Sequence, residues 1–290
     1  MASIALIGVD WGSTNLRAFA IDETGTILGR KECRIGATLD ARGRHASILD
    51  ELLAEWRKPA TPIVVCGMAG ARDGWIEIPY VGCSANASSL RAGLLEVASN
   101  IWIVPGVKVE SGDVLIDVMR GEETQAIGAN LINPEGIVIC PGTHSKWVRM
   151  EGDKIASLRT YMTGELFEML RRHWAPDAAE TATNDSAFDR GLETAWEKPL
   201  ISSLFSLRIG KISGRLAESE VADYLSGLVI GAEIAATDFA AAMPYRIVGA
   251  QGLTSRYARA LAIRGAKKVA QLDAAECVAK GLLAIWNPKP

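Results

Sequence analysis

The sequence predicts an α/β protein, and three observations lead to this prediction. Short apolar runs of strand length alternate with segments of helical periodicity along the 290 residues. A β-hairpin pattern with a glycine and hydroxyl residues at its tip occurs near the start of the chain. The same pattern returns in the middle of the chain, and such a duplication predicts two related domains.

The first hairpin pattern opens with the apolar run Ile4 to Val9, which predicts a strand buried on both faces. Asp10 and Gly12-Ser13-Thr14 follow, and Leu16 to Ile21 predicts the returning strand. Glycine lets backbone N–H groups approach an anion closely, and hydroxyls add donors. Asp10 repels a phosphate, so its expected role is to hold Mg²⁺ or the water around it. An ordinary hairpin with an exposed Asp is the alternative.

The second pattern consists of a buried strand, Gly136 to Cys140, a tip that contains Gly142-Thr143, and a returning strand. Cys140 stands where the first pattern has Asp10, so the acid is not repeated. Lys146 could reach a phosphate, although a solvated strand lysine is an equal alternative. His144 is more often a structural histidine than a base. Two such hairpins predict two domains that face each other across a nucleotide.

Composition excludes several classes of partner. A net charge of −3 argues against a surface for nucleic acid or anionic membrane. The apolar run Tyr224 to Ala232 is too short for a membrane span. Five cysteines without C-x-x-C spacing and three histidines predict reduced thiols, no metal cluster and a cytoplasmic location.

A glycine-rich loop follows the predicted strand Pro62 to Cys66 and ends in Arg72, Asp73 and Trp75. Functional side chains commonly follow a strand in this way. Arg72 could fork onto a carboxylate, Asp73 could accept from hydroxyls, and Trp75 could form a wall. The alternative is a surface turn with an exposed ion pair and Trp75 in the core.

Glu122 and Glu123 stand at the start of a predicted helix, where the helix dipole favours carboxylates. They could be ordinary first-turn acids, or one could be a general base. Neighbours on a helix lie about 100° apart, so the two acids cannot point the same way.

The second half of the chain predicts further helices. Thr163 is expected to cap one helix, and Pro176 to Gly191 is polar and predicted to be a loop, a lid or a crossing segment. Glu220 to Met243 predicts a long helix whose small residues would pack closely against a sheet.

Near the C-terminal end, Gly249-Ala250-Gln251-Gly252 predicts a turn that a flat purine could approach. A helix is expected to start after it, at Thr254 or Ser255, and the segment Ala274 to Trp286 predicts the last helix.

These motifs resemble the actin, hexokinase and Hsp70 ATPase superfamily of sugar kinases over nearly the whole chain. Within it, the chain closely resembles the 2-dehydro-3-deoxygalactonokinase family. The finer match is carried by Asp10 to Arg17, Gly67-Met68 with Arg72 and Gly74-Trp75, Arg120 to Gln125, and Pro141 to Trp147.

The resemblance implies two ribonuclease-H-like (actin-like ATPase) domains with a central cleft. Residues 1–130 would form an N-terminal domain for the sugar and the first phosphate site. Residues 131–272 would form a nucleotide-binding domain, and 273–290 a closing helix that packs back on the first domain.

The resemblance further implies transfer of the ATP γ-phosphate to the 6-hydroxyl of 2-dehydro-3-deoxy-D-galactonate, in D-galactonate breakdown. Asp10 would serve Mg²⁺, and Glu122 would be the base, with Glu123 as the second candidate. The expected substrate-binding residues are Arg72, Asp73, Trp75, Asn15 and Arg17. The expected ATP-binding residues are Gly12, Ser13, Thr14, Gly142, Thr143, His144, Lys146, Gly249 and Gln251.

Two departures from the family's relatives affect these roles. The base is Glu where the glycerol-kinase-like relatives have Asp, and Cys140-Pro141 replaces the acid of the second phosphate motif. The alternatives are a kinase of another small sugar or sugar acid, and a nucleotide-gated interaction protein of the actin or Hsp70 kind. The expected partners are a sugar acid and ATP, with no nucleic acid and no membrane, and a homodimer is one option.

Overall fold

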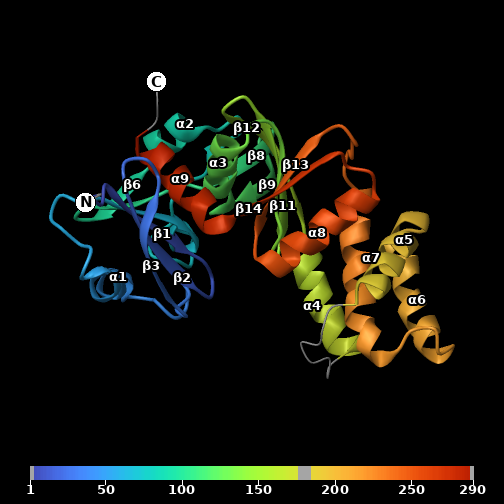
Figure 1. Cartoon of the computed structure of the whole chain (residues 1–290). Helices are drawn as coiled ribbons and strands as arrows, with labels where there is room; N and C mark the ends of the chain where they lie inside the picture. The colour runs from blue at the N-terminus through green and yellow to red at the C-terminus, as the bar shows by residue number, and fades with distance from the viewer. Residues whose placement is uncertain (1–2, 176–183, 288–290) are drawn as a thin grey trace. The chain divides into compact units, whose positions relative to one another are not determined.

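A computed structural model describes residues 3–175 and 184–287 (Figure 1). The chain divides into two compact units. Unit 1 contains Met1–Cys140, Lys146–Arg159 and Leu272–Pro290, and unit 2 contains Pro141–Ser145 and Thr160–Gln271. The domain boundaries predicted from the sequence, at 130/131 and 272/273, stay a prediction.

The described strands form three sheets. The first has the order β3 (Ile27–Cys33), β2 (Leu16–Ile21), β1 (Leu6–Trp11), β4 (Ile63–Gly67), β7 (Ile101–Ile103) and β6 (Leu95–Ala98). The second has the order β12 (Lys154–Tyr161), β11 (Ser145–Glu151), β10 (Gly136–Cys140), β13 (Pro244–Gly249) and β14 (Lys268–Asp273). The third has the order β5 (Val81–Gly82), β8 (Val107–Ser111) and β9 (Val114–Met119).

The first two sheets begin with the same strand order. In each, a three-stranded meander is extended on the side of its first strand, by β4, β7 and β6 in the first sheet and by β13 and β14 in the second. In the first sheet β1 pairs antiparallel with β2 and parallel with β4. The repeated order is that of a duplicated α/β fold, as the two hairpin patterns predict.

Helices lie between groups of these strands along the chain. In chain order they are α1 (His45–Leu53), η1 (Met68–Gly70), α2 (Ala87–Ala92), α3 (Glu122–Ile132), α4 (Thr163–Trp174), α5 (Asp185–Glu197), α6 (Leu200–Ile212), η2 (Glu218–Glu220), α7 (Val221–Ala235), α8 (Gln251–Ile263) and α9 (Ala274–Trp286). Helices α4 to α7 follow one another with no strand between them in the described residues. No helix in the described ranges is both long and apolar enough to cross a membrane.

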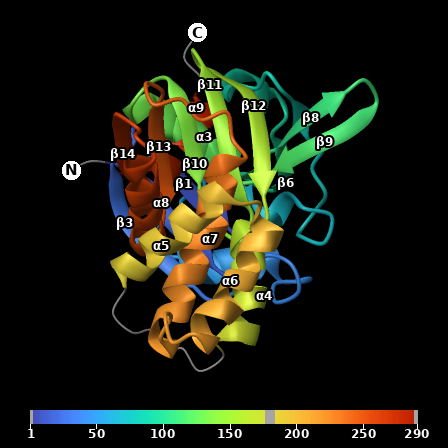
Figure 2. The same cartoon turned by 90° about the vertical axis from the view of Figure 1, so that its right-hand side faces the viewer.

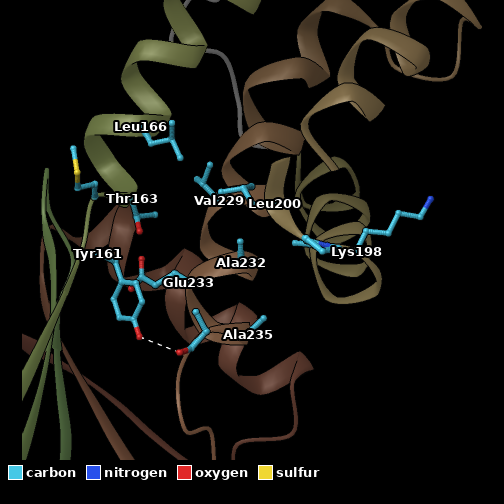
Figure 3. Close-up of a pocket in the computed structure, with 13 residues that line it drawn as sticks. Tyr161, Thr163, Leu166, Lys198, Leu200, Val229, Ala232, Glu233 and Ala235 are labelled. Carbon is cyan, nitrogen blue, oxygen red and sulfur yellow. Dashed lines mark hydrogen bonds between the residues drawn. The ribbon is translucent and has the colours of Figure 1, made fainter. Parts of the chain in front are cut away.

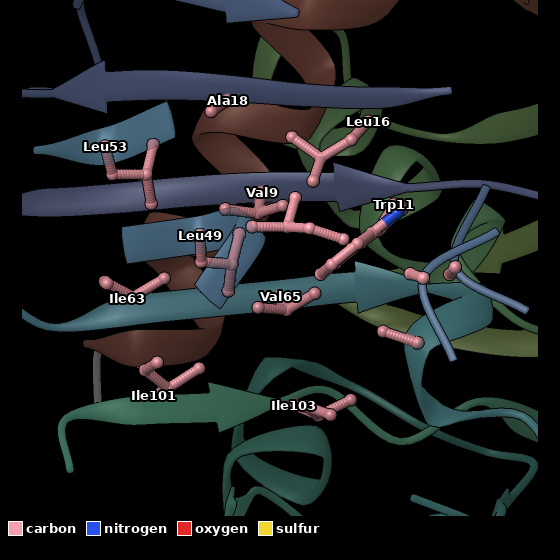
Figure 4. Close-up of a cluster of buried hydrophobic side chains, with 14 of the residues drawn as sticks. Val9, Trp11, Leu16, Ala18, Leu49, Leu53, Ile63, Val65, Ile101 and Ile103 are labelled. Carbon is pink, nitrogen blue, oxygen red and sulfur yellow. The ribbon is translucent and has the colours of Figure 1, made fainter. Parts of the chain in front are cut away.

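The core of unit 1 surrounds the first sheet. On one face, side chains of β1, β2, β4 and β7 pack against Leu49 and Leu53 of α1 (Figure 4). On the other face α9 lies so close to β1 that a Cβ on Gly8 would stand 2.7 Å from Leu282 Cδ1. Strand β1 is therefore buried on both faces, as its unbroken apolar sequence predicts.

Helix α7 is the centre of unit 2, where α4, α5, α6 and α8 pack against it (Figure 2). A Cβ on Gly227 of α7 would lie 2.0 Å from Phe188 O, and one on Gly191 of α5 would lie 2.2 Å from Tyr224 O. The small residues of α7 therefore allow close packing against the helix α5. The expectation that they pack against a sheet was wrong.

Three further expectations need correction. Residues 185–191, expected to be loop, are the start of α5, whereas 176–183 lie outside the described residues. Helix α7 ends at Ala235, well before Met243. Helix α8 begins at Gln251, so the predicted purine turn is in part a first helical turn.

Candidate active site

The first hairpin places an acid beside a glycine tip. Strands β1 and β2 pair with Asp10 opposite Arg17, and the tip is closed by Gly12 N–H donating to Asn15 O at 2.9 Å. Ala37 N–H donates to Gly12 O at 3.0 Å, so the segment after β3 braces the tip. The predicted residues Ser13, Thr14 and Asn15 are exposed there.

The carboxylate of Asp10 is largely enclosed. Its side chain is 17% exposed, and Arg17 Nη1 lies 3.5 Å from its Oδ2. Burial raises the pKa of Asp10, and the Arg17 charge opposes this rise. Arg17, predicted to bind substrate, thus has an electrostatic role toward Asp10.

Two glycines bring the start of α3 close to Asp10. Gly67 at the end of β4 has φ +91°, and Gly121 before α3 has φ +109°. A Cβ on Gly67 would lie 2.7 Å from Trp11 O and 3.5 Å from Asp10 Oδ1. One on Gly121 would lie 3.2 Å from the Cα of Gly67. This backbone approach, which side chains would prevent, joins the two sequence-predicted acid sites.

The two acids of α3 differ in access. Glu123 is fully buried; its carboxylate accepts from Gly121 N at 2.6 Å and from Thr124 Oγ1 at 3.0 Å. Glu122 is only partly buried and accepts from Arg120 N at 3.1 Å. Both acids therefore accept backbone N–H groups that lie just before the first turn of α3, where the helix dipole favours carboxylates, but only Glu122 also reaches the surface.

The charges around the two acids shift their titration. Burial raises the pKa of Glu122, the charge of Lys146 lowers it by less, and Asp10 adds a smaller rise. Burial and the charge of Glu122 raise the pKa of Glu123 to about 7. Asp10, Glu122, Glu123 and Lys146 thus form one electrostatically coupled group in unit 1.

Lys146 is buried, not solvated. Its side chain comes from β11, opposite Cys140 of β10, and its residue is 7% exposed. Its Nζ donates to Val118 O at 2.7 Å, at the end of β9. The solvated-lysine alternative is therefore wrong, and the lysine charge lies next to the candidate base.

The Arg72–Trp75 loop divides into an exposed and a packed part. Arg72 and Asp73 are exposed, and among the described residues neither has an ion pair. Trp75 stacks on His45 with ring centroids 5.4 Å apart, and His45 also contacts Trp11 edge-on at 5.3 Å. Trp75 is partly buried and packs against the core, while Arg72 and Asp73 are available to a ligand.

Unit 2 contains a cavity of about 500 Å³ beside the second hairpin tip. Its lining comes from the tip, from the first turns of α4 and α8, and from α7. Glu165 N–H donates to Thr143 O at 2.9 Å, and a Cβ on Gly164 would lie 2.2 Å from Gly142 O. A glycine tip between two helix N-termini is a favourable place for phosphate groups.

Of the predicted ATP-binding residues, Gly142 and Thr143 line this cavity. His144 Nε2 and Glu165 Oε2 form a hydrogen bond of 2.7 Å, which holds the tip against α4. Gly249 and Gln251 lie just before and at the start of α8. Gly252, the last residue of the predicted purine turn, also lines the cavity. The sequence did not point to the other lining residues, namely Thr163, Gly164, Phe167, Ser226, Val229, Ile230, Leu253, Arg256 and Tyr257.

Arg256 supplies this cavity with a guanidinium group. It pairs with Asp223, and its guanidinium carbon lies 5.2 Å from the ring centre of Phe188. Its Nη1 is buried without a hydrogen-bond partner in the described part of the chain. A spare donor of this kind suits an acceptor atom of a bound base or phosphate.

A buried carboxylate, that of Glu233, is hydrogen-bonded to Tyr257, which lines the same cavity. Glu233 accepts from Ser145 Oγ at 2.8 Å and from Tyr257 OH at 2.6 Å. Burial and Glu233 raise the pKa of Tyr257 well above its ordinary value. Glu233 also lines a neighbouring, mainly apolar cavity of about 470 Å³, in which Lys198 extends away from the other labelled side chains (Figure 3).

The donor set fits a nucleotide-borne Mg²⁺. The described residues contain no group of three or more His, Cys, Asp or Glu side chains that could hold a metal. Mg²⁺ commonly keeps several waters and binds through one or two carboxylates plus substrate phosphates. Asp10, a single enclosed carboxylate beside a glycine tip, is sufficient for that mode.

Comparison with known proteins agrees with this chemistry. A family model described as 2-keto-3-deoxy-galactonokinase matches residues 10–285. The chain belongs to the 2-keto-3-deoxy-galactonokinase family.

It is 39% identical over 264 residues to the 2-dehydro-3-deoxygalactonokinase of Escherichia coli (strain K12), a match that covers 89% of this chain and 90% of that protein. A crystal structure of a Sinorhizobium meliloti protein assigned to the same activity superposes with a TM-score of 0.83. It is 33% identical, and the match covers 98% of each chain.

The fold extends beyond the family. Component A of (R)-2-hydroxyglutaryl-CoA dehydratase from Acidaminococcus fermentans superposes with a TM-score of 0.53, at 13% identity over 98% of this chain and 97% of that chain. The predicted α/β, actin-like ATPase fold is confirmed, and so is the predicted family. Family membership also establishes that the chain belongs to the class of sugar-acid kinases rather than to the nucleotide-gated interaction proteins.

Proposed function

We propose that this chain transfers the γ-phosphate of ATP to the 6-hydroxyl of 2-dehydro-3-deoxy-D-galactonate, in D-galactonate breakdown. Its relatives are named 2-dehydro-3-deoxygalactonokinase. Phosphoryl transfer needs phosphate donors, an acid for the metal and a group that accepts the hydroxyl proton. The candidates are the glycine tip beside the cavity of unit 2 for the phosphates, and Asp10 and Glu122 of unit 1 for the other two roles.

The observation that carries the proposal is the environment of Glu122. It is the partly exposed member of the acid pair, it starts α3, and it lies near Asp10 and Lys146. A base works best when its pKa lies near the working pH, and burial moves the pKa of Glu122 in that direction. Glu122 would orient the sugar hydroxyl and take its proton.

The remaining roles follow from charge and position. Arg72 would clamp the sugar-acid carboxylate, with Asp73 accepting from its hydroxyls. Gly142, Thr143 and the first turns of α4 and α8 would hold the nucleotide, while Gly12, Ser13 and Thr14 would bind phosphate oxygens. Asp10 would hold hydrated Mg²⁺, which when bound neutralises phosphate charge. A cytoplasmic location belongs to the same proposal.

A coupled ADP-release assay tests the proposal. The panel contains 2-dehydro-3-deoxy-D-galactonate, other 2-keto-3-deoxy acids, and hexoses. We expect the highest kcat/KM with the galactonate. Arg72→Met should raise KM for the acid, because the carboxylate loses its clamp. Equal activity on a hexose would contradict a sugar-acid kinase.

Glu122→Gln tests the base. We expect kcat to fall by about 10² or more, the usual scale for loss of a general base. The variant should still bind a non-hydrolysable ATP analogue, as measured by isothermal titration calorimetry. Glu123→Gln is the matched control and should retain more activity, because Glu123 is buried behind it. Near-normal turnover of the Glu122 variant would pass the role to Glu123 or Asp73.

A further inference from the structure

Helix α6 carries large apolar side chains on its outer side. Ile201, Phe205, Ile209 and Ile212 are 88%, 58%, 50% and 74% exposed. Their spacing of four, four and three residues places them along one side of the helix. We call these four side chains the α6 stripe.

The opposite side of α6 is already used. Ser203 and Leu207 are buried there, where α6 packs against α5 and α7, and Figure 1 shows α6 at the outer side of that pair. A helix that is apolar all round is normally buried all round. The other outer helix of unit 2, α4, instead exposes ion pairs of Glu168 with Arg171 and Arg172. The α6 stripe is thus unlike an ordinary solvated face.

The exposed area suits a protein interface. At roughly 150–200 Å² per large apolar side chain, the stripe exposes about 400–550 Å² of apolar surface per chain. The largest apolar patch on a typical soluble monomer has about 300–600 Å² and is often functional, so a patch of this size is a candidate interaction site. A standard interface buries about 800 Å² per partner, so the stripe supplies the apolar centre and its polar neighbours the rim.

We propose that the α6 stripe is the interface of a homodimer in which two copies of α6 pack antiparallel about a two-fold axis. The stripe has nearly the same spacing from either end, so Phe205 of one copy meets Ile209 of the other, and Ile201 meets Ile212. Such a self-complementary patch is what a two-fold interface requires. Antiparallel packing also opposes the two helix dipoles.

Sedimentation equilibrium of the full chain tests the dimer. The wild type should be dimeric at about 50 μM, within the range expected of a modest interface. The double variant Phe205→Glu/Ile209→Glu should be monomeric, since it would place four carboxylates in the dimer centre. Leu115→Glu/Ile116→Glu is the matched control, because these residues are 56% and 59% exposed on β9. That control should remain dimeric.

Mixing variants tests which surfaces meet. Phe205→Lys/Ile209→Lys should also be monomeric alone, and it should form a mixed dimer with the Glu variant. A monomeric wild type would assign the stripe to a different partner and overturn the proposal. So would a Glu variant that stays dimeric, a β9 control that dissociates, or oppositely charged variants that fail to associate. Circular dichroism should show native helix content in every variant, since all substituted side chains are exposed.

Discussion

The two hairpins place different chemistry at equivalent positions. In the first, Asp10 stands opposite Arg17 across β1 and β2. In the second, Cys140 stands opposite Lys146 across β10 and β11. The cation is kept in both copies, whereas the acid is kept in only one.

This difference changes what each cation does. Arg17 is half exposed and pairs with Asp10, so its charge is largely neutralised within the hairpin. Lys146 has a thiol opposite it, is buried, and lowers the pKa of Glu122. The duplication therefore repeats a backbone geometry while dividing the chemistry. One copy has an enclosed acid, which we propose serves Mg²⁺, and the other has a cation beside Glu122, the proposed base.

Asp10→Asn, in the first hairpin, should have the largest effect on activity. We expect kcat to fall by about 10³, the upper end of losses for one preorganised electrostatic group. The fall should be partly relieved at high Mg²⁺, because the metal would still arrive with the nucleotide. Initial rates across a Mg²⁺ series measure it.

Cys140→Ser is the control at the equivalent position and should change kcat little, since both side chains are uncharged. Equal losses in the two variants would show that the hairpins do not divide the chemistry in this way.

Lys146→Met should come next, with kcat/KM lower by about 10². The lysine charge lowers the pKa of Glu122, so its removal should raise that pKa further. The acidic limb of the pH profile should therefore move to higher pH. Lys154→Met, at an exposed lysine at the start of β12, should leave the profile in place. If the acidic limb of the pH profile did not move in Lys146→Met, the charge of Lys146 would not influence the pKa of the base.

The locally encoded elements were predictable from the sequence. The helix that starts at Glu122 and the helix Ala274–Trp286 lie where expected, because a charged first turn and an apolar period mark them. Helix α5 was missed because its segment is polar and its glycine, Gly191, serves contact with α7. Helix α6 was missed because it is apolar on two sides and has no clear period.

The candidate site residues also differ in whether local sequence could predict them. Asp10 lies near the end of β1, Lys146 near the start of β11 and Glu122 at the start of α3, so local sequence patterns could predict their positions. Arg256 and Tyr257 belong to α8 and reach the unit 2 cavity only through packing against α7. No local motif marks such residues, and nonlocal packing alone brings them to the site.

Glu123→Gln should have a smaller, pH-dependent effect on stability. The folded-state pKa of about 7 lies above the ordinary value of 4.5, so the folded chain holds this proton longer than the unfolded chain. The contribution of Glu123 to the free energy of unfolding is thus largest below pH 4.5 and falls as pH rises through 7. The loss is on the order of 3 kcal/mol.

Urea unfolding between pH 5 and 8 measures this contribution. The Glu123→Gln variant should lose less stability than the wild type over that range, because glutamine does not ionise. Glu135→Gln, at an exposed acid, should follow the wild type. A variant with the wild-type slope would mean that Glu123 is ionised throughout, and the contrast between the two acids of α3 would then fail.

The glycines should give the smallest effects and separate ligand contact from folding. A Cβ on Gly142 would meet no atom of the described chain within 4 Å, and one on Gly12 would lie 3.6 Å from Asn15 O. The tip glycines are thus not required by packing.

Gly142→Ala should raise KM for ATP about tenfold, by obstructing the approach of the phosphates to the backbone, at unchanged melting temperature. Gly121→Ala should do the reverse and destabilise the fold by about 1–3 kcal/mol, since its φ of +109° strains any side chain. If Gly142→Ala lowered the melting temperature and left KM unchanged, the second tip would be structural, and only the first hairpin would remain a phosphate site.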